Sequence, residues 1–190
     1  MIHALIELDI SDTRQSIREV RRNTHVFLSL TGYLVYCAAR AVEKNPWIHA
    51  YRDWRNRLIA FDEVDVSTTI ERRIGDQNEV IPKILRKANR KSFFEISEEI
   101  RRARNEPLEK AEVYRWIKKY LAIPVFLRRL VFRILDRFPK AMKKRAGTMM
   151  VTSVQMAGPG SAWGIPVASH TLNLAIGGVT SKVVEREGKF

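Results

Sequence analysis

The chain has 190 residues, of which 45% are apolar and 29% are charged, and its formal net charge is +13. This length and composition fit one folded domain and exclude a disordered chain. The single cysteine, Cys37, excludes an internal disulfide framework and a cysteine zinc cluster, and its apolar helical surroundings predict a buried, inert thiol.

The excess of positive charge suggests attraction to a polyanion, such as a nucleic acid, an anionic membrane surface or a phosphorylated ligand. Arg and Lys are spread over several helical stretches and interleaved with Glu, and do not form a basic tail. The first ten residues do not resemble a signal peptide, and no apolar run reaches the roughly 18 residues that a membrane span needs. We therefore expect a cytoplasmic protein.

The first part of the chain predicts a strand followed by two helices. Residues 3–10 alternate in polarity, which is typical of a strand. Residues 11–23 open with capping residues and predict a short polar helix. Residues 29–46 predict a buried helix that begins at a Ser and ends at Asn-Pro. Its expected apolar positions are Leu30, Leu34, Ala38 and Val42.

The middle of the chain predicts strands and then a capped helix. Residues 57–72 are rich in β-branched residues and predict one or two strands. Residues 79–88 predict a further strand, in which Pro82 indicates an edge position. Ser92 and Glu95 have the spacing of a capping box, so a helix is expected to begin there.

Residues from about 107 to 146 are basic and helical in pattern, with Pro124 and Pro139 as interruptions. Apolar residues fall on one helical face and Arg residues on the other. The apolar residues are Leu127, Leu130, Val131, Ile134, Leu135 and Phe138, and the basic residues are Arg128, Arg129, Arg133 and Arg137. Beyond Gly147 the pattern predicts strands over residues 148–156, 171–179 and 182–186. Because strands and helices follow one another without a regular βαβ alternation, the predicted class is α+β with a mixed or antiparallel sheet.

An ordered series of segments resembles the catalytic domain of the 2-oxo acid dehydrogenase acyltransferases, the dihydrolipoamide acyltransferases. The segments are HALIELDIS, LSLTGYLVYCAARAVEKNPWIHAYRDW, FDEVDVSTTIERR, NRKSFFEISEEIRRA, GTMMVTSVQMAG and HTLNLAIGGV. The resemblance covers nearly the whole chain. It implies one domain over residues 1–190 with the two-layer sandwich of chloramphenicol acetyltransferase, a mixed sheet with helices on one face, and a basic helical insertion at about 107–146. The chain has no room for a lipoyl or peripheral-subunit-binding domain.

The resemblance also implies a reaction, namely CoA-dependent acyl transfer between a thioester and a thiol such as a dihydrolipoyl group. It implies a homotrimer with active sites between subunits, and no metal. In the family a His-x-x-x-Asp-Gly histidine is the general base, and a Ser or Thr hydroxyl on a strand that begins Gly-Thr stabilises the oxyanion. Gly147 and Thr148 match that beginning and Thr152 matches the oxyanion donor, although β propensity alone also explains a Thr there. Arg90 and Lys91 are candidates for the CoA phosphates, with a solvated surface pair as the alternative.

The 190 residues contain no His-x-x-x-Asp-Gly motif. Only His49 has an Asp four residues later, Asp53, but Trp54 follows where the motif has Gly, so this match is interpreted as a decoy. His3 resembles a structural, hydrogen-bonded histidine of the family, and His170 has no recognisable partner. We therefore expect a family member that is shortened at both ends and is inactive alone.

Two further interpretations stay open. The basic helix over residues 124–145 fits a packing helix with a solvated basic face, a contact with a neighbouring subunit, or a membrane-surface helix, and we favour packing over the membrane. The alternative function is therefore a non-catalytic trimeric assembly protein or a membrane-surface-associated interaction protein. Nucleic-acid binding lacks a supporting motif, and we expect the four scattered Trp residues in the core or at an interface. These are Trp47, Trp54, Trp116 and Trp163.

Overall fold

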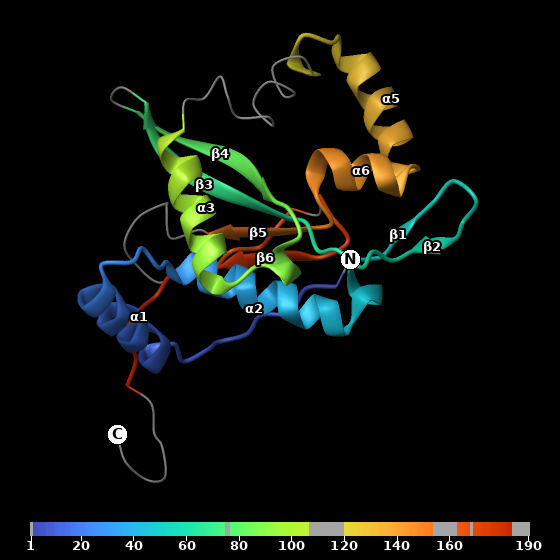
Figure 1. The fold of residues 1–190 in the computed structure, drawn as a ribbon. Coiled ribbons are helices and arrows are strands. Elements are labelled where there is room, and N and C mark those ends of the chain that lie inside the picture. Colours follow the sequence, from blue (N-terminus) through green and yellow to red (C-terminus); the bar gives the residue numbers. More distant parts are fainter. Residues whose placement is uncertain (1, 75–76, 107–119, 154–162, 168, 184–190) are drawn as a thin grey trace.

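The structure, a computed structural model, describes residues 2–74, 77–106, 120–153, 163–167 and 169–183 (Figure 1). The first half of the chain contains α1 (Ser11–Thr24), α2 (Leu30–Lys44), η1 (Pro46–His49), β1 (Tyr51–Arg52), β2 (Leu58–Ile59), β3 (Val66–Ile74) and β4 (Gln77–Leu85). The chain continues with η2 (Ala88–Arg90), α3 (Phe93–Asn105), α5 (Val125–Asp136), α6 (Pro139–Ala146), β5 (Met149–Ser153) and β6 (Asn173–Ile176).

The main sheet is mixed and has the strand order β4-β3-β5-β6. β3 and β4 are antiparallel, whereas β5 runs parallel to β3 and β6 runs parallel to β5. Pro82 lies opposite Thr69 on the edge strand β4, as its missing N–H group predicts. Separately, β1 and β2 form a short antiparallel ribbon. The predicted α+β class with a mixed sheet is confirmed.

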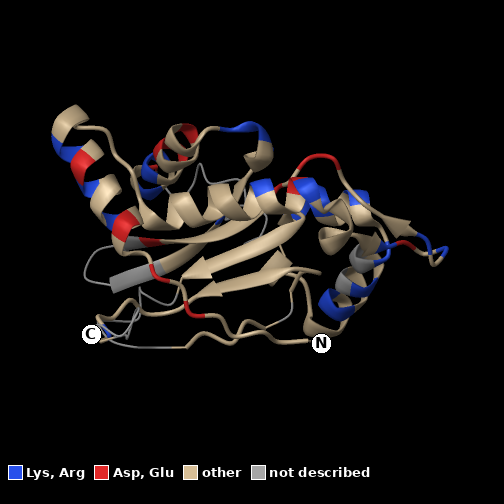
Figure 2. Ribbon diagram, turned by 90° about the horizontal axis from the view of Figure 1, so that it is seen from below, with Lys and Arg blue, Asp and Glu red and all other residues tan. Residues whose placement is uncertain are grey.

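Helices α2 and α3 lie side by side on one face of this sheet (Figures 1 and 2). The core lies between the two layers and consists of apolar side chains from both helices and from β3, β4 and β5. Its members include Val35, Ala39, Val42, Val66, Ile70, Leu85, Ile96, Ile100, Met149 and Val151. Among the described residues, no helical layer covers the opposite face of the sheet (Figure 2).

The local sequence signals located most helices correctly. α3 begins at the predicted capping box, in which Glu95 N donates to Ser92 Oγ at 3.2 Å and Ser92 N donates to Glu95 Oε2 at 2.8 Å. Ser29 caps α2 through Gly32 N at 3.0 Å. Pro139 opens α6, so the predicted basic helix is two helices, and α1 matches its predicted range.

Three predictions about burial and local structure are wrong. Residues 2–10 have no regular secondary structure, because no strand of the described chain pairs with them, and Leu5, Ile6 and Leu8 are exposed. The buried face of α2 runs through Val35, Ala39 and Val42, so Val42 alone of the four predicted positions is fully buried, whereas Leu30, Leu34 and Ala38 are half-buried and Ala38 packs against the core. Cys37 is exposed, because a residue two positions after Val35 is turned about 200° away from it.

The remaining predictions are confirmed only in part. β5 and β6 lie within the predicted ranges 148–156 and 171–179, whereas residues 154–156 are outside the described residues. Residues 182 and 183 are not in a strand, and 184–186 are not described. Trp47, Trp54 and Trp163 are exposed and so are not core residues, and Trp116 is outside the described residues. In the described segments, no helix is both long enough and apolar enough to span a bilayer.

Candidate functional site

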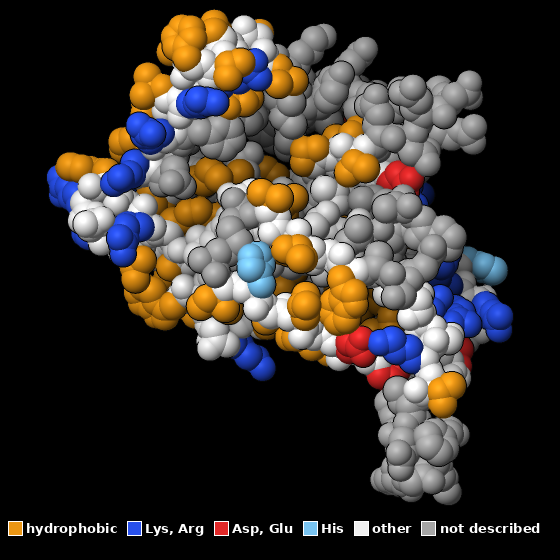
Figure 3. Space-filling view, turned by 180° about the vertical axis from the view of Figure 1, so that it is seen from behind, with side chains coloured by type: hydrophobic (Ala, Val, Ile, Leu, Met, Phe, Trp, Pro, Cys, Tyr) orange, Lys and Arg blue, Asp and Glu red, His pale blue; other side chains and the backbone are white. Residues whose placement is uncertain are grey.

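β5 places Thr152 on the face of the sheet that α2 and α3 leave uncovered. Side chains alternate along the strand, so Met149 and Val151 enter the core while Thr152 points to the other face and is half-buried. Thr152 Oγ1 lies 3.1 Å from Thr69 Oγ1 on β3. Figure 3 shows the side of the molecule away from α2 and α3, where hydrophobic and uncharged side chains predominate near the middle. The hydroxyl is therefore not enclosed by the core of the subunit.

The start of β5 is fixed by Gly147 and Thr148, the two residues that the sequence singled out. Gly147 ends α6 with φ 91° and ψ −170°, a conformation open almost only to glycine. A Cβ atom at this position would lie 2.7 Å from Asp65 O. Thr148 N donates to the same carbonyl at 2.7 Å, and Asp65 N donates to Thr148 Oγ1 at 3.1 Å. These contacts align β5 beside β3.

His49 is part of the same buried network. Its Nδ1 lies 3.1 Å from Thr148 Oγ1, and its Nε2 lies 3.0 Å from the Phe61 carbonyl. Because a carbonyl can only accept, we place a proton on Nε2. The Thr148 hydroxyl lies within hydrogen-bond distance of both His49 Nδ1 and the Asp65 carbonyl oxygen, the latter at 3.2 Å. Burial lowers the pKa of the His49 imidazole. Both ring nitrogens are used, which agrees with the interpretation of His49 as a decoy.

Asp53, the other half of that sequence match, stabilises a turn. Its carboxylate accepts from the backbone N–H groups of Arg55 and Arg57 at 2.8 and 2.9 Å, and from Arg57 Nε at 2.9 Å. The Asp53 carboxylate thus stabilises the turn that joins β1 to β2. No hydrogen bond between Asp53 and His49 is present in the structure.

His170 precedes β6 and has partners that the sequence did not indicate. Its Nε2 lies 2.9 Å from the Ala146 carbonyl, and its Nδ1 lies 2.9 Å from Ser169 Oγ. Burial lowers the pKa of this imidazole as well. The partner at Ala146 is 24 positions away, so no local pattern could have revealed it. His3, in contrast, is exposed and outside regular structure.

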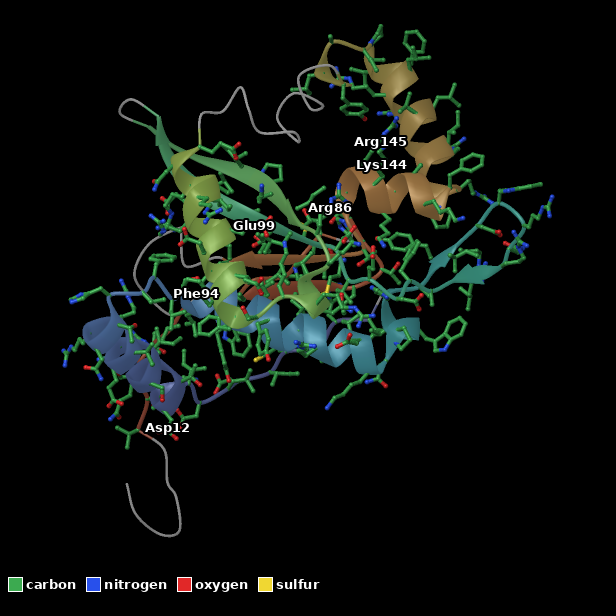
Figure 4. The ribbon with its side chains drawn as sticks, in the orientation of Figure 1. Asp12, Arg86, Phe94, Glu99, Lys144 and Arg145 are labelled. Atoms are coloured by element: carbon green, nitrogen blue, oxygen red, sulfur yellow. The ribbon has the colours of Figure 1, made fainter. Side chains whose placement is uncertain are left out.

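Arg90 and Lys91 lie on the helix-covered side of the sheet, between α2 and α3. Arg90 Nη1 is 3.7 Å from Glu43 on α2, and Lys91 Nζ is paired with Glu99 on α3 (Figure 4). The structure therefore does not bring these two cations together with Thr152, which is on the opposite face. In the described parts of the chain, no group of His, Cys, Asp and Glu side chains could hold a metal ion.

Arg86 joins the end of β4 to the end of α6, close to the start of β5. Its Nη1 donates to Asp65 Oδ2 at 3.0 Å and to the Lys143 carbonyl at 2.8 Å, while Nη2 donates to the Lys144 carbonyl (Figure 4). The guanidinium thus satisfies carbonyls at the C-terminal end of α6, where a cation is favourable. Sequence reasoning missed this residue, because its partners are 21 to 58 positions away.

Comparison with known proteins decides the family. Residues 5–113 match the family of the 2-oxoacid dehydrogenases acyltransferase (catalytic domain). The chain belongs to this family. The match covers more than half of the chain, including α1, α2, β3, β4 and α3.

Solved structures of acyltransferase cores share the fold. A truncated catalytic core of the 2-oxoacid dehydrogenase multienzyme complex from Thermoplasma acidophilum is 19% identical, with TM-score 0.56 over 96% of this chain and 69% of that one. The cubic core of a pyruvate dehydrogenase multienzyme complex is 13% identical, with TM-score 0.62 over 95% of this chain and 63% of that one. Azotobacter vinelandii dihydrolipoamide acetyltransferase is 15% identical, with TM-score 0.63 and the same coverages, 95% and 63%.

These likenesses confirm the predicted chloramphenicol acetyltransferase-like fold for the acyltransferase domain. The chain spans roughly two thirds of the length of the solved cores, from 63% to 69%. A comparison with curated protein sequences finds no match.

Proposed function

We propose that the chain is a CoA-dependent acyltransferase domain in which Thr152 stabilises the oxyanion of a tetrahedral intermediate. The observation that carries the proposal is the position of this hydroxyl, half-buried on the uncovered face of the sheet and 3.1 Å from Thr69 Oγ1. In the Azotobacter enzyme, the catalytic mechanism has been investigated through a serine, a histidine and an asparagine. We assign the hydroxyl role in this chain to Thr152.

In the proposed reaction a thiol sulfur attacks the carbonyl carbon of a thioester. The carbonyl oxygen becomes an oxyanion that accepts a hydrogen bond from Thr152, and the C–S bond to the leaving thiolate then breaks. The proton lost by the attacking thiol reaches the leaving thiolate through a base, so one thioester and one thiol give another thioester and another thiol. A preorganised donor of this kind is worth about 3–4 kcal/mol of barrier.

The substrates that we propose are an acyl-CoA and a dihydrolipoyl-type thiol, and the assembly that we propose is a homotrimer in the cytoplasm. The solved relatives support this choice, because they are cores of multienzyme complexes and a dihydrolipoamide acetyltransferase. Arg90 and Lys91 remain candidates for the CoA phosphates. A phosphate would have to replace Glu43 and Glu99 as their partners.

The general base is the part of the site that we do not assign to this chain. The His-x-x-x-Asp-Gly motif does not occur in its 190 residues. His49 and His170 already use both ring nitrogens in hydrogen bonds. We therefore expect the isolated chain to transfer acyl groups only when a base is supplied.

Chemical rescue with imidazole tests this proposal. Acetyl-CoA and dihydrolipoamide are incubated with the chain over a range of imidazole concentrations, and the S-acetyl product is measured by chromatography. The expected result is a rate above that of imidazole without protein, which Thr152→Val lowers by about 10²-fold. The matched control is Ser153→Ala, which removes a hydroxyl from the other face of the same strand. Equal rates for Thr152→Val and the wild type would remove Thr152 from the mechanism.

The alternative function is a non-catalytic trimeric assembly protein. The observation that favours it is the double hydrogen bonding of His49 and His170, which leaves neither imidazole with a free ring nitrogen. A trimer in sedimentation analysis, combined with no imidazole-dependent transfer above the protein-free rate, would select this alternative.

A further inference from the structure

Helix α5 exposes large apolar side chains that nothing in the described chain covers. It packs mainly against α6 and projects from the body of the domain (Figure 1). Phe126 is 75% exposed, Leu130 51% and Ile134 49%, with Leu127 at 41% and Phe138 at 49%. Packing within the subunit therefore leaves these apolar side chains uncovered in the described chain.

The exposed apolar residues form a row. Leu127, Leu130 and Ile134 are three or four positions apart in α5, so they lie on one side of the helix, and Phe138 follows just after its end. We call this row, together with Phe126, the α5 surface. An apolar row with this spacing on a helix usually faces the core of a domain and is buried.

Basic side chains are concentrated near the α5 surface. Between residues 120 and 146 the chain has a single acidic residue, Asp136, and eight basic residues, which are Arg128, Arg129, Arg133, Arg137, Lys140, Lys143, Lys144 and Arg145. Arg129 and Arg133 are exposed and four positions apart in α5, so they form a basic row beside the apolar one, and the exposed Arg137 directly follows the last residue of the helix. Figures 2 and 3 show this concentration of Lys and Arg on the part of the molecule that α5 and α6 form.

An exposed tryptophan adjoins the end of α5. The turn between β1 and β2 contacts the helix through Trp54 N, which donates to the Arg137 carbonyl at 3.1 Å. Trp54 is 56% exposed, and the Arg55 guanidinium lies 4.5 Å from the centroid of its ring. Tryptophan and arginine together are typical of the boundary between water and lipid headgroups.

We propose that the α5 surface docks on an anionic lipid membrane, with α5 lying in the headgroup region. The apolar row enters the boundary of the acyl chains, and Arg129, Arg133 and Arg137 contact the lipid phosphates. Trp54 adds an anchor at the C-terminal end of the helix. This proposal is independent of the acyl-transfer chemistry proposed above.

The charge and the apolar row of the α5 surface favour an anionic membrane over a second copy of the chain or a nucleic acid. A second copy of the chain carries the same net charge of +13 and the same basic row, so two α5 surfaces would repel each other. A nucleic acid would satisfy the arginines but would leave Phe126, Leu130 and Ile134 in water. An anionic membrane satisfies both rows at once.

Vesicle co-sedimentation of the purified chain tests the proposal. Vesicles of phosphatidylcholine alone are compared with vesicles that also contain phosphatidylglycerol, at low and high salt. The expected result is retention on the anionic vesicles, weakened by salt, and little retention on the neutral ones. Leu130→Asp should lower the partition coefficient by about tenfold or more, because it removes one apolar side chain and adds a negative charge at the lipid surface.

Matched controls distinguish binding through the α5 surface from non-specific hydrophobic adsorption and from an effect of net charge alone. Val80→Asp likewise replaces an apolar side chain, a slightly smaller one, with a carboxylate at a residue of similar exposure, 54%, on β4. Arg18→Glu with Arg22→Glu on α1 matches the charge change of Arg129→Glu with Arg133→Glu on α5. Only the α5 variants should lose binding, and circular dichroism should show that all variants are folded.

Three results would overturn the proposal. The first is equal binding by the α5 variants and their controls, and the second is equal binding to neutral and anionic vesicles. The third is a lower molecular mass of Leu130→Asp in solution, which would make the α5 surface a contact between copies of the chain. If Leu130→Asp does not fold, the two charge-reversal pairs alone decide the question.

Discussion

The hydroxyls of Thr69 and Thr152 lie 3.1 Å apart on neighbouring parallel strands, β3 and β5. Each hydroxyl has one proton, so only one of them can donate within this pair. If Thr69 donates, the proton of Thr152 is free to bind an oxyanion. Thr69 would then act as a positioning residue for the proposed oxyanion donor.

Thr69→Val should slow the imidazole-rescued transfer by roughly tenfold, less than Thr152→Val, because the donor remains but loses its orientation. Thr69→Ser keeps a hydroxyl and should restore most of the rate. The measurement is the dependence of the rate on substrate concentration, in which kcat should fall and KM should change little. A change in KM alone would indicate that Thr69 contributes to substrate binding and does not orient Thr152.

The buried His49 and the half-buried His170 predict the pH dependence of stability. Burial lowers the pKa of His49 and of His170 from the ordinary value of 6.5, so the unfolded chain binds protons that the folded chain does not. The stabilisation is therefore complete above pH 6.5 and is lost as the pH falls below it. Urea titrations between about pH 7.5 and 5 should show a lower free energy of unfolding at the lower pH, with a slope of up to about 1.4 kcal/mol per pH unit for each group.

His49→Gln should flatten this slope, although it lowers stability at every pH, because Gln does not titrate and packs less well. The matched control is His3→Gln at an exposed position, which should leave the slope unchanged. An unchanged slope in both His49→Gln and His170→Gln would show that neither imidazole is neutral in the folded protein at low pH.

Sequence reasoning succeeded where a structural signal is local. Ser29 and the pair Ser92 and Glu95 marked helix starts, Pro82 marked an edge strand, and Pro139 marked a break, because each acts on backbone groups within a few residues. The fold itself followed from the resemblance of the ordered segments to the acyltransferase family.

The errors concern contacts between distant parts of the chain. Residues 3–10 have the alternation of a strand, but alternation cannot supply a neighbouring strand to pair with. The apolar residues of α2 surround much of the helix, so the sequence could not show which side meets the sheet. For this reason Cys37 was predicted to be buried, although it is exposed. The bond between His49 and Thr148 joins residues 99 positions apart. The candidate site is similar, because the partner of Thr152 is on a strand 83 positions earlier.

Arg86 should contribute strongly to stability. Asp65, its carboxylate partner, is buried, and the same guanidinium binds the Lys143 and Lys144 carbonyls at the end of α6. Arg86→Met should lower the free energy of unfolding by about 2–4 kcal/mol, because it leaves a buried carboxylate without its cation. Arg86→Lys should recover little of this, since an ammonium group cannot reproduce the planar fork. Chemical denaturation measures each value.

A matched control for Arg86 is Arg102→Met. Arg102 also pairs with a carboxylate, Glu98, but its side chain is 77% exposed. Its loss should cost less than about 1 kcal/mol. Similar losses for Arg86→Met and Arg102→Met would mean that Arg86 does not hold α6 against the sheet in solution.

Gly147 is the position at which backbone geometry most restricts the sequence. With φ 91° and ψ −170° it occupies a region that side chains exclude, and a Cβ atom would lie 2.7 Å from the Asp65 carbonyl oxygen, which cannot move without breaking its bond to Thr148 N. Gly147→Ala should therefore destabilise the protein by about 2 kcal/mol or more. Gly147→Asn should not recover this loss, because Asn tolerates the left-handed helical region but not this one. Lys140→Ala, at an exposed site on α6, is the control and should change stability by less than about 0.5 kcal/mol.

Because Gly147 sets the start of the strand that carries Thr152, Gly147→Ala should also reduce imidazole-rescued transfer under conditions where the variant is folded. Full activity in a folded Gly147→Ala protein would show that β5 does not depend on this turn for the position of Thr152.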